Sequence, residues 1–122
     1  MNHWTELALA VDVTAAGSAV QVAAVTEAGR QADAILGEPP LPGSVEWHAE
    51  DGTDVPVQRE RAWQLLQLRI ALAAGLDPLP VLIGLRRHGS TWDEIAHAAG
   101  STPQSARGRW EAAVSAVLHR DG

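Results

Sequence analysis

Three residues near the end of the chain have the types and spacing of side chains that read DNA bases. Gln104, Arg107 and Gly108 lie three and four residues apart, so a helix would place them on one face. Glutamine can form paired hydrogen bonds with adenine, and arginine with guanine, in the major groove. Gly108 either lets the helix backbone come close to a duplex or is merely tolerated there. Its helix propensity is about 1 kcal/mol less favourable than that of alanine. Base contacts by Gln104, Arg107 and Gly108 are therefore expected.

Four further residues are expected to contact phosphates. Thr102 stands at the start of the helix that carries Gln104, and Arg109 lies between the two faces of that helix. Arg86 and Arg87 lie at the end of an earlier helix. Phosphate contacts of this kind orient a protein on DNA without reading its sequence. The alternative for Arg86 and Arg87 is that they neutralise the negative end of their own helix.

Two helices separated by a tight turn must position these side chains. Thr91 and Glu94 have the spacing of a capping box, so a helix is predicted to start after Thr91 and to end at Gly100. Thr102 then caps a second helix whose first residue is Pro103. Apolar residues recur at helical spacing in both segments: Trp92, Ile95, Ala96 and Ala99, then Ala106, Trp110, Ala113, Val114 and Val117. This spacing predicts a helix-turn-helix.

Residues 90–110 resemble the promoter-reading C-terminal helix-turn-helix of bacterial sigma factors and the related DNA-binding modules of response regulators. The likeness is carried by Trp92, Glu94-Ile95-Ala96, Gly100, Thr102-Pro103, Ser105-Ala106-Arg107 and Arg109-Trp110. The chain departs from the pattern at Ser101, where an apolar residue usually follows the turn glycine, and at Ala106, which is smaller than the usual valine. The resemblance implies that residues 102–110 are the recognition helix and that the three base-reading residues face DNA.

The N-terminal part of the chain, residues 1–36, is rich in alanine and valine. The helix propensity of alanine favours two helices here, one opening at Thr5 and a second beginning after a break at Gly17-Ser18. A strand remains an alternative for residues 7–13, where apolar residues alternate with period two. Small apolar faces without a polar cluster predict a segment for dimerisation or contact with a partner.

Residues 37–56 are expected to form a Pro/Gly-rich acidic connecting loop. Asp51-Gly52 is a favoured hairpin turn, so a short hairpin is one possibility. Pro56 favours the other, an extended loop that runs into the next helix. The remaining residues, 57–120, are assigned to the helix-turn-helix domain.

That C-terminal domain is predicted to open with two helices that support the helix-turn-helix. Residues 57–75 are dense in leucine, and Gly75 ends this helix. Asp77 can cap the next helix, which carries apolar residues from Leu79 to Leu85. The fold class is therefore mainly α: a three- or four-helix C-terminal unit with an N-terminal helical extension and a Pro-rich connecting loop.

Composition limits the classes of function. The 122 residues include no cysteine, so a disulfide framework and a thiolate zinc site are both excluded. Glu94 and His97 form a single pair with no second ligand motif, and no nucleophile or phosphate-binding glycine loop is evident. We expect no catalytic residue, no metal, no cofactor and no enzymatic activity. Without a basic signal region or a long apolar run, we also expect a cytoplasmic protein that does not enter a membrane.

Charge is distributed unevenly along the chain, whose formal net charge is −6. Residues 1–85 carry four arginines against eleven acidic residues, whereas residues 86–122 carry five arginines against four. So weakly basic a module gains little from counterion release, and useful affinity for DNA calls for a dimer or a partner.

These observations predict a sequence-specific transcription regulator that binds double-stranded DNA as a homodimer. The alternative is a protein-interaction module that contacts RNA polymerase, a sigma factor or another regulator without binding DNA. Glu111 on the outward face and the acidic body of the chain fit that alternative.

Overall fold

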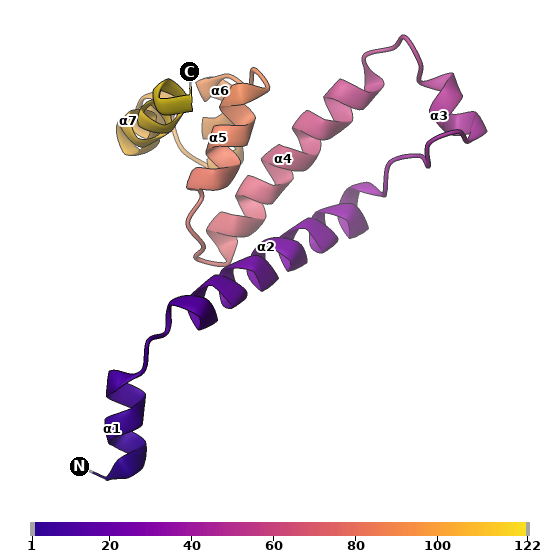
Figure 1. The fold of residues 1–122 in the computed structure, drawn as a ribbon. Coiled ribbons are helices and arrows are strands. Elements are labelled where there is room, and N and C mark those ends of the chain that lie inside the picture. The colour runs from indigo at the N-terminus through magenta and orange to yellow at the C-terminus, as the bar shows by residue number, and fades with distance from the viewer. Residues whose placement is uncertain (1, 122) are drawn as a thin grey trace.

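The computed structural model describes residues 2–121, which contain seven helices and no strand (Figure 1). In chain order they are α1 (His3–Ala10), α2 (Thr14–Leu36), α3 (Val45–Ala49), α4 (Val55–Ala73), α5 (Leu79–Arg87), α6 (Trp92–Ala99) and α7 (Pro103–Asp121). The predicted mainly α-helical fold is confirmed.

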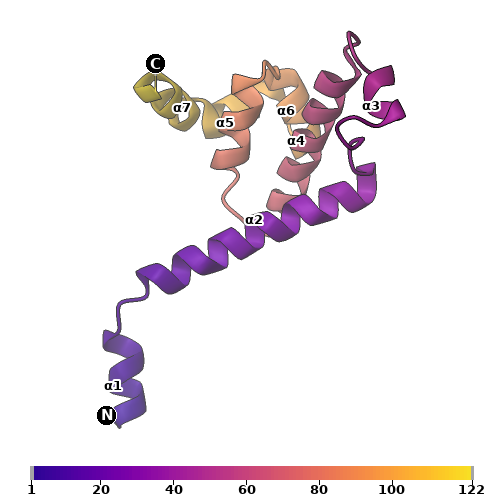
Figure 2. The same cartoon turned by 45° about the vertical axis from the view of Figure 1, so that its right-hand side comes forward.

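The hydrophobic core lies where the last four helices meet. Leu68 of α4, Leu82 and Leu85 of α5, Ile95 of α6 and Val114 of α7 all have 1% or less of their surface exposed. Burying one such side chain contributes about 1.5–3 kcal/mol, so these contacts hold the four helices together. Figures 1 and 2 show α5 and α6 beside α4, with α7 packed against α5 and α6 on the side away from α4.

Three successive helices of this unit end in the same way. A glycine with φ between 71° and 86° follows each of α4, α5 and α6: Gly75, Gly89 and Gly100. After α6, the N–H of Ser101 donates to the carbonyl of Ala96 at 2.9 Å while Gly100 takes the left-handed conformation, the pattern of a Schellman motif. Only glycine adopts this conformation without strain, so the predicted ends at Gly75 and Gly100 are confirmed.

Two details of the C-terminal helices differ from the prediction. α4 begins at Val55, two residues earlier than expected, and Pro56 lies in its first turn, where no backbone donor is needed. Ala113 is exposed, although the apolar spacing predicts it on the buried stripe of the last helix, whereas Ala106 and Trp110 are buried. The core-facing stripe of α7 is therefore narrower than the apolar pattern suggests.

α2 lies along α4 through small residues (Figures 1 and 2). Ala28 and Ala32 are the buried residues of α2. A Cβ added at Gly29 would lie 3.5 Å from the ring of Trp63, so the two helices approach closely. The indole Nε1 of Trp63 donates to Asp33 Oδ1 at 2.9 Å and ties α4 to α2.

The N-terminal part of the chain projects away from this body (Figures 1 and 2). We call residues 3–23, which comprise α1 and the first part of α2, the arm. Within the arm only Thr5 is partly shielded, and all other residues are exposed. No single described helix is long and apolar enough to cross a membrane; α1 and α2 together meet that length and composition test but are bent by 69°.

The helices of the arm have different bounds from those predicted. Asn2 caps α1 by accepting the N–H of Thr5 at 2.8 Å, so Thr5 lies inside the helix. The chain then breaks at Asp12, whose carboxylate accepts both the N–H and the hydroxyl of Thr14, at 3.0 and 2.7 Å. α2 runs through Gly17, so the predicted break at Gly17 and the serine after it is wrong.

The two strand alternatives are also wrong. Residues 7–13 form the end of α1 and the break after it, and no described strand is present to pair with them. No hairpin forms at Asp51-Gly52; instead Ser44 caps the short helix α3, and Pro56, which cannot donate to a strand ladder, enters α4.

Candidate nucleic-acid interface

The first turns of α7 have two unlike faces. Ala106 and Trp110 have 0% and 9% of their surface exposed and anchor the helix in the core. Gln104, Arg107 and Gly108 are all exposed. The structure therefore brings the three predicted base-reading residues together on one solvent-facing surface, which we call the outer face of α7.

Thr102 occupies the N-cap of α7, as predicted. Its Oγ1 accepts the backbone N–H of Ser105 at 3.1 Å, and its carbonyl accepts the N–H of Ala106 at 2.9 Å. Pro103 fills the first helical position, which needs no donor. Because its oxygen accepts this cap bond, the exposed hydroxyl of Thr102 keeps its own proton for donation to a phosphate.

Arg107 has an acidic neighbour on the outer face of α7. Its Nε lies 4.0 Å from Glu111 Oε2, and the two side chains are 59% and 50% exposed. An exposed i,i+4 pair of this kind contributes about 0.3–0.5 kcal/mol. Both side chains thus remain available to a ligand, and Glu111 partly offsets the charge that Arg107 would present to it.

Gly108 is not explained by packing inside the chain. A Cβ added there would have nothing within 4 Å, and the residue lacks the positive φ that favours glycine elsewhere in this protein. The outer face of α7 is consequently flat at this point.

Arg109 lies on the aromatic ring of its neighbour. Its guanidinium carbon is 4.3 Å from the centroid of Trp110, within the range of a cation–π contact. Arg109 is nevertheless exposed. The contact with the ring limits the motion of the Arg109 side chain but leaves its N–H groups able to donate to a phosphate. A phosphate contact is the role predicted for Arg109.

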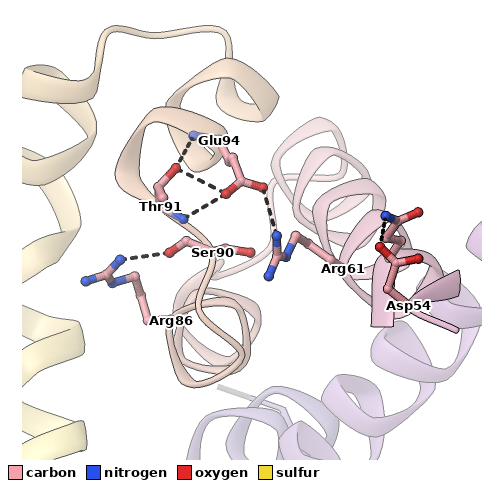
Figure 3. Close-up of polar contacts among 7 residues, drawn as sticks. Asp54, Arg61, Arg86, Ser90, Thr91 and Glu94 are labelled. Carbon is pink, nitrogen blue, oxygen red and sulfur yellow. Dashed lines mark hydrogen bonds and ion pairs between the residues drawn. The ribbon is translucent and has the colours of Figure 1, made fainter. Parts of the chain in front are cut away.

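Arg86 is half-buried and makes contacts within the protein (Figure 3). Its Nη1 donates to the carbonyl of Ser90 at 2.8 Å, and its guanidinium lies 5.3 Å from the centroid of the Trp92 ring. Arg87, in contrast, is exposed. A phosphate contact by Arg86 would compete with these two contacts.

The start of α6 is fixed by the capping box that the sequence predicts. Thr91 Oγ1 accepts the N–H of Glu94 at 3.1 Å, and Glu94 Oε1 accepts the N–H of Thr91 at 3.2 Å (Figure 3). Glu94 Oε2 also lies 4.0 Å from Nη1 of Arg61, which comes from α4. The carboxylate therefore links the start of α6 to the helix behind it.

Two buried polar residues were missed by the sequence reasoning. Ser90 is fully buried, and its hydroxyl has no hydrogen-bond partner in the part of the chain that the structure describes. Gln64 is 9% exposed, and its Nε2 lies 3.1 Å from Nδ1 of His88. Gln64 shares helical spacing with the buried Leu68 and Ala71, a signal that could have identified it as a core-facing residue.

No group of three or more potential metal ligands comes together among residues 2–121. In the acidic connecting loop, Glu50 forms an ion pair with Arg59. Asp54 accepts a hydrogen bond from Gln58 at 2.7 Å (Figure 3). These carboxylates act on the start of α4 and do not converge on a common point.

Comparison with known proteins identifies no relative: no family model matches the chain, and neither a curated protein nor a solved structure matches it. The functional proposal therefore depends on the geometry of α6 and α7 and on the chemistry of the outer face of α7.

Proposed function

We propose that the protein binds double-stranded DNA as a sequence-specific transcription regulator, with α6 and α7 acting as a helix-turn-helix and α7 entering the major groove. One observation carries this proposal. Gln104 and Arg107 are exposed side by side on the first turns of a helix whose opposite side is anchored by Ala106 and Trp110. A helix fixed in this way presents its N-terminal residues to base edges.

Each residue of the outer face has a chemical role in this proposal. Arg107 would donate two hydrogen bonds to O6 and N7 of guanine, and Gln104 would pair with N6 and N7 of adenine. Gly108 would let the backbone approach the bases. Thr102 and Arg109, at the edges of this face, would contact phosphates and fix the register of α7 in the groove.

The local charge of the turn and recognition segment suits an anionic ligand. No acidic residue occurs between Ile95 and Trp110, whereas Arg107 and Arg109 both do. The formal charge of −6 for the whole chain nevertheless keeps the affinity of a single copy low. We therefore expect two copies to bind two half-sites separated by about 34–36 Å or a multiple of it.

A second candidate function follows from the pairing of Arg107 with Glu111. A face with both charges, on a chain with an acidic excess, also suits a protein surface of mixed charge. In this alternative the same helix pair contacts RNA polymerase, a sigma factor or another regulator, and no duplex is bound.

Selection from a pool of random duplexes at low and moderate salt tests the first candidate against the second. We expect the wild-type protein to enrich a sequence motif. Arg107→Ala should lose the preference at one base pair, where the lost discrimination against the wrong base is about 1–3 kcal/mol. Arg69→Ala removes an exposed arginine from α4 and should leave the motif unchanged. Failure of the folded wild-type protein to enrich any motif at low salt would refute DNA reading by the isolated protein and favour the protein-interaction module.

A further inference from the structure

The arm, residues 3–23, exposes large apolar side chains. Trp4, Leu9, Val20 and Val22 have 75%, 72%, 69% and 65% of their surface exposed, and α1 has no buried residue. Isolated surface leucines or valines are ordinary, but a continuous apolar segment of this size indicates an interaction surface. The arm is thus the strongest candidate for an interface in the described chain.

The first part of α2 is uncharged on every side. No acidic or basic residue occurs from Val13 to Thr26, a stretch that makes nearly four turns of helix. A helix that lacks a charged face is normally covered by other protein or by lipid. In this structure it is covered only beyond residue 23, where α2 reaches α4.

The exposed area of the chain is larger than its mass predicts. Residues of the whole chain expose 8494 Å². A folded monomer of 12.9 kDa is expected to expose about 6,300 Å². The excess of about 2,200 Å² compares with the roughly 1,000–2,500 Å² that each partner buries in an obligate dimer. The unburied surface is therefore sufficient for a stable dimer.

We propose that the arm is a dimer interface and that its occupant is the arm of a second copy of this chain. Two copies with a formal charge of −6 repel each other overall, so an uncharged surface on each copy favours their association. The stretch from Val13 to Thr26 meets this condition, and a two-fold axis would place identical apolar patches against each other.

The close packing that such an interface requires already occurs within the chain. α2 approaches α4 through Ala28, Gly29 and Ala32. The arm part of α2 is equally rich in small residues, with Ala15, Ala16, Gly17, Ser18 and Ala19 in succession. A second helix can therefore come as close to the arm as α4 does to the rest of α2.

A lipid bilayer is a poorer occupant than a second copy. Asp12 lies between the two helices of the arm, and hydrogen bonds from the N–H and then the hydroxyl of Thr14 lower the pKa of its carboxyl below the usual value. A carboxylate at this position is costly to place inside hydrocarbon. The first arginine of the chain is Arg30, so the arm has no arginine or lysine to contact anionic lipid headgroups.

Sedimentation equilibrium of the full-length chain tests the inference. We expect the wild-type protein to have twice the monomer mass of 12.9 kDa. Val20→Glu places a like charge on each arm and should weaken association by at least about 10-fold. Val45→Glu introduces the same charge at an 81% exposed valine of α3 and should not change association. Circular dichroism establishes that each variant is folded, and Leu9→Glu replaces Val20→Glu if the latter unfolds.

Three outcomes would overturn the inference. The first is a monomeric wild-type protein up to about 100 µM. The second is equal dimerisation by the arm variant and Val45→Glu. The third is a monomer that binds phosphatidylcholine vesicles through Val20, which would identify lipid as the occupant. The inference does not rest on DNA reading: a dimer that enriches no duplex would refute the proposed function alone.

Discussion

The guanidinium of Arg86 donates from Nη1 to the backbone carbonyl of Ser90 at 2.8 Å, and it thereby ties the end of α5 to the residue before the cap of α6. The same guanidinium lies over Trp92, the first residue of α6. Ser90 is fully buried, so its carbonyl would otherwise have little access to water. The orientation of α6 relative to α5 consequently depends on an arginine that sequence reasoning assigned to phosphate.

Arg86→Ala should therefore lower the free energy of unfolding. Loss of the charge-assisted hydrogen bond and of the contact with Trp92 is expected to cost about 1–2 kcal/mol. Arg69→Ala, at an exposed position of α4, should cost less than about 0.5 kcal/mol. Urea unfolding measures both. Unchanged stability of Arg86→Ala, together with weaker duplex binding, would instead assign Arg86 to a phosphate.

The capping box of α6 provides a second test of how this region is held. Thr91→Ala removes the oxygen that accepts the N–H of Glu94 and should destabilise the protein by about 1 kcal/mol. Thr91→Ser keeps a hydroxyl at the same position and should retain most of that stability. Thermal unfolding of the two variants compares them directly, and equal losses would show that the methyl group of Thr91, not its hydroxyl, is responsible.

The C-terminal half of the fold was predictable because its signals are local. A capping box at Thr91 and Glu94, a turn glycine at Gly100 and a cap at Thr102 each act within one turn of helix, and all three are present as expected. Apolar spacing also identified Ile95 as buried. Hydrogen bonding of Arg86 to Ser90 was not predictable, because nothing in residue type distinguishes a guanidinium that turns inward from one that faces solvent.

The arm was harder to predict because its residues do not pack against the rest of the chain. Its apolar pattern could not be matched to a core, so helix and strand both remained possible for residues 7–13. The sequence predicts a break at Gly17, although a helix tolerates glycine at a cost of about 1 kcal/mol relative to alanine. The actual break depends on Asp12, whose carboxylate bonds to Thr14. The boundary between α1 and α2 therefore coincides with the hydrogen bonds of Asp12 and not with the glycine.

Burial of Ile95 predicts a large difference between two identical substitutions. Ile95 of α6 is completely buried in the core cluster, whereas Ile35 of α2 is 65% exposed. Ile95→Ala should cost about 2–5 kcal/mol, since it leaves a cavity as well as losing buried surface. Ile35→Ala should cost less than about 1 kcal/mol. Similar losses for the two variants in urea unfolding would contradict the core described here.

Glu27 should protonate at an unusually low pH. Hydrogen bonds from Arg30, with its Nε 2.8 Å from Glu27 Oε2, and from Gln31 lower the pKa of Glu27 from 4.5 to about 2. Because the folded pKa is depressed, any contribution of this carboxylate to stability is present above about pH 4.5 and is lost as the pH falls towards 2. Carbon-13 NMR of the carboxyl group measures the titration directly.

A matched pair of substitutions separates the local cause of this shift from the charge of the whole protein. Arg30→Gln should move the pKa of Glu27 back towards 4.5. Arg69→Gln makes the same change of net charge on α4 and should leave the titration near 2. If both variants shifted the titration equally, long-range electrostatics rather than the contact with Arg30 would be responsible.

Glu111 offers the most direct probe of DNA reading by the outer face of α7. Its carboxylate lies 4.0 Å from Arg107 and is exposed. In the proposed complex with DNA it would draw the guanidinium away from a base and would repel phosphate. Glu111→Gln should therefore raise affinity for the selected duplex by about 3–10-fold, with a smaller gain at high salt. Glu46→Gln removes the same charge from α3 and should change affinity much less.

The direction of the effect also distinguishes two ways of using Glu111. A gain of affinity means that the carboxylate is only an electrostatic obstacle. A loss that is confined to duplexes with cytosine at one position would mean that Glu111 accepts a hydrogen bond from the amino group of that base, as acidic side chains do in the major groove. No change in either duplex affinity or selected motif would place the outer face of α7 outside the DNA interface, because a charge so close to Arg107 cannot be removed there without consequence.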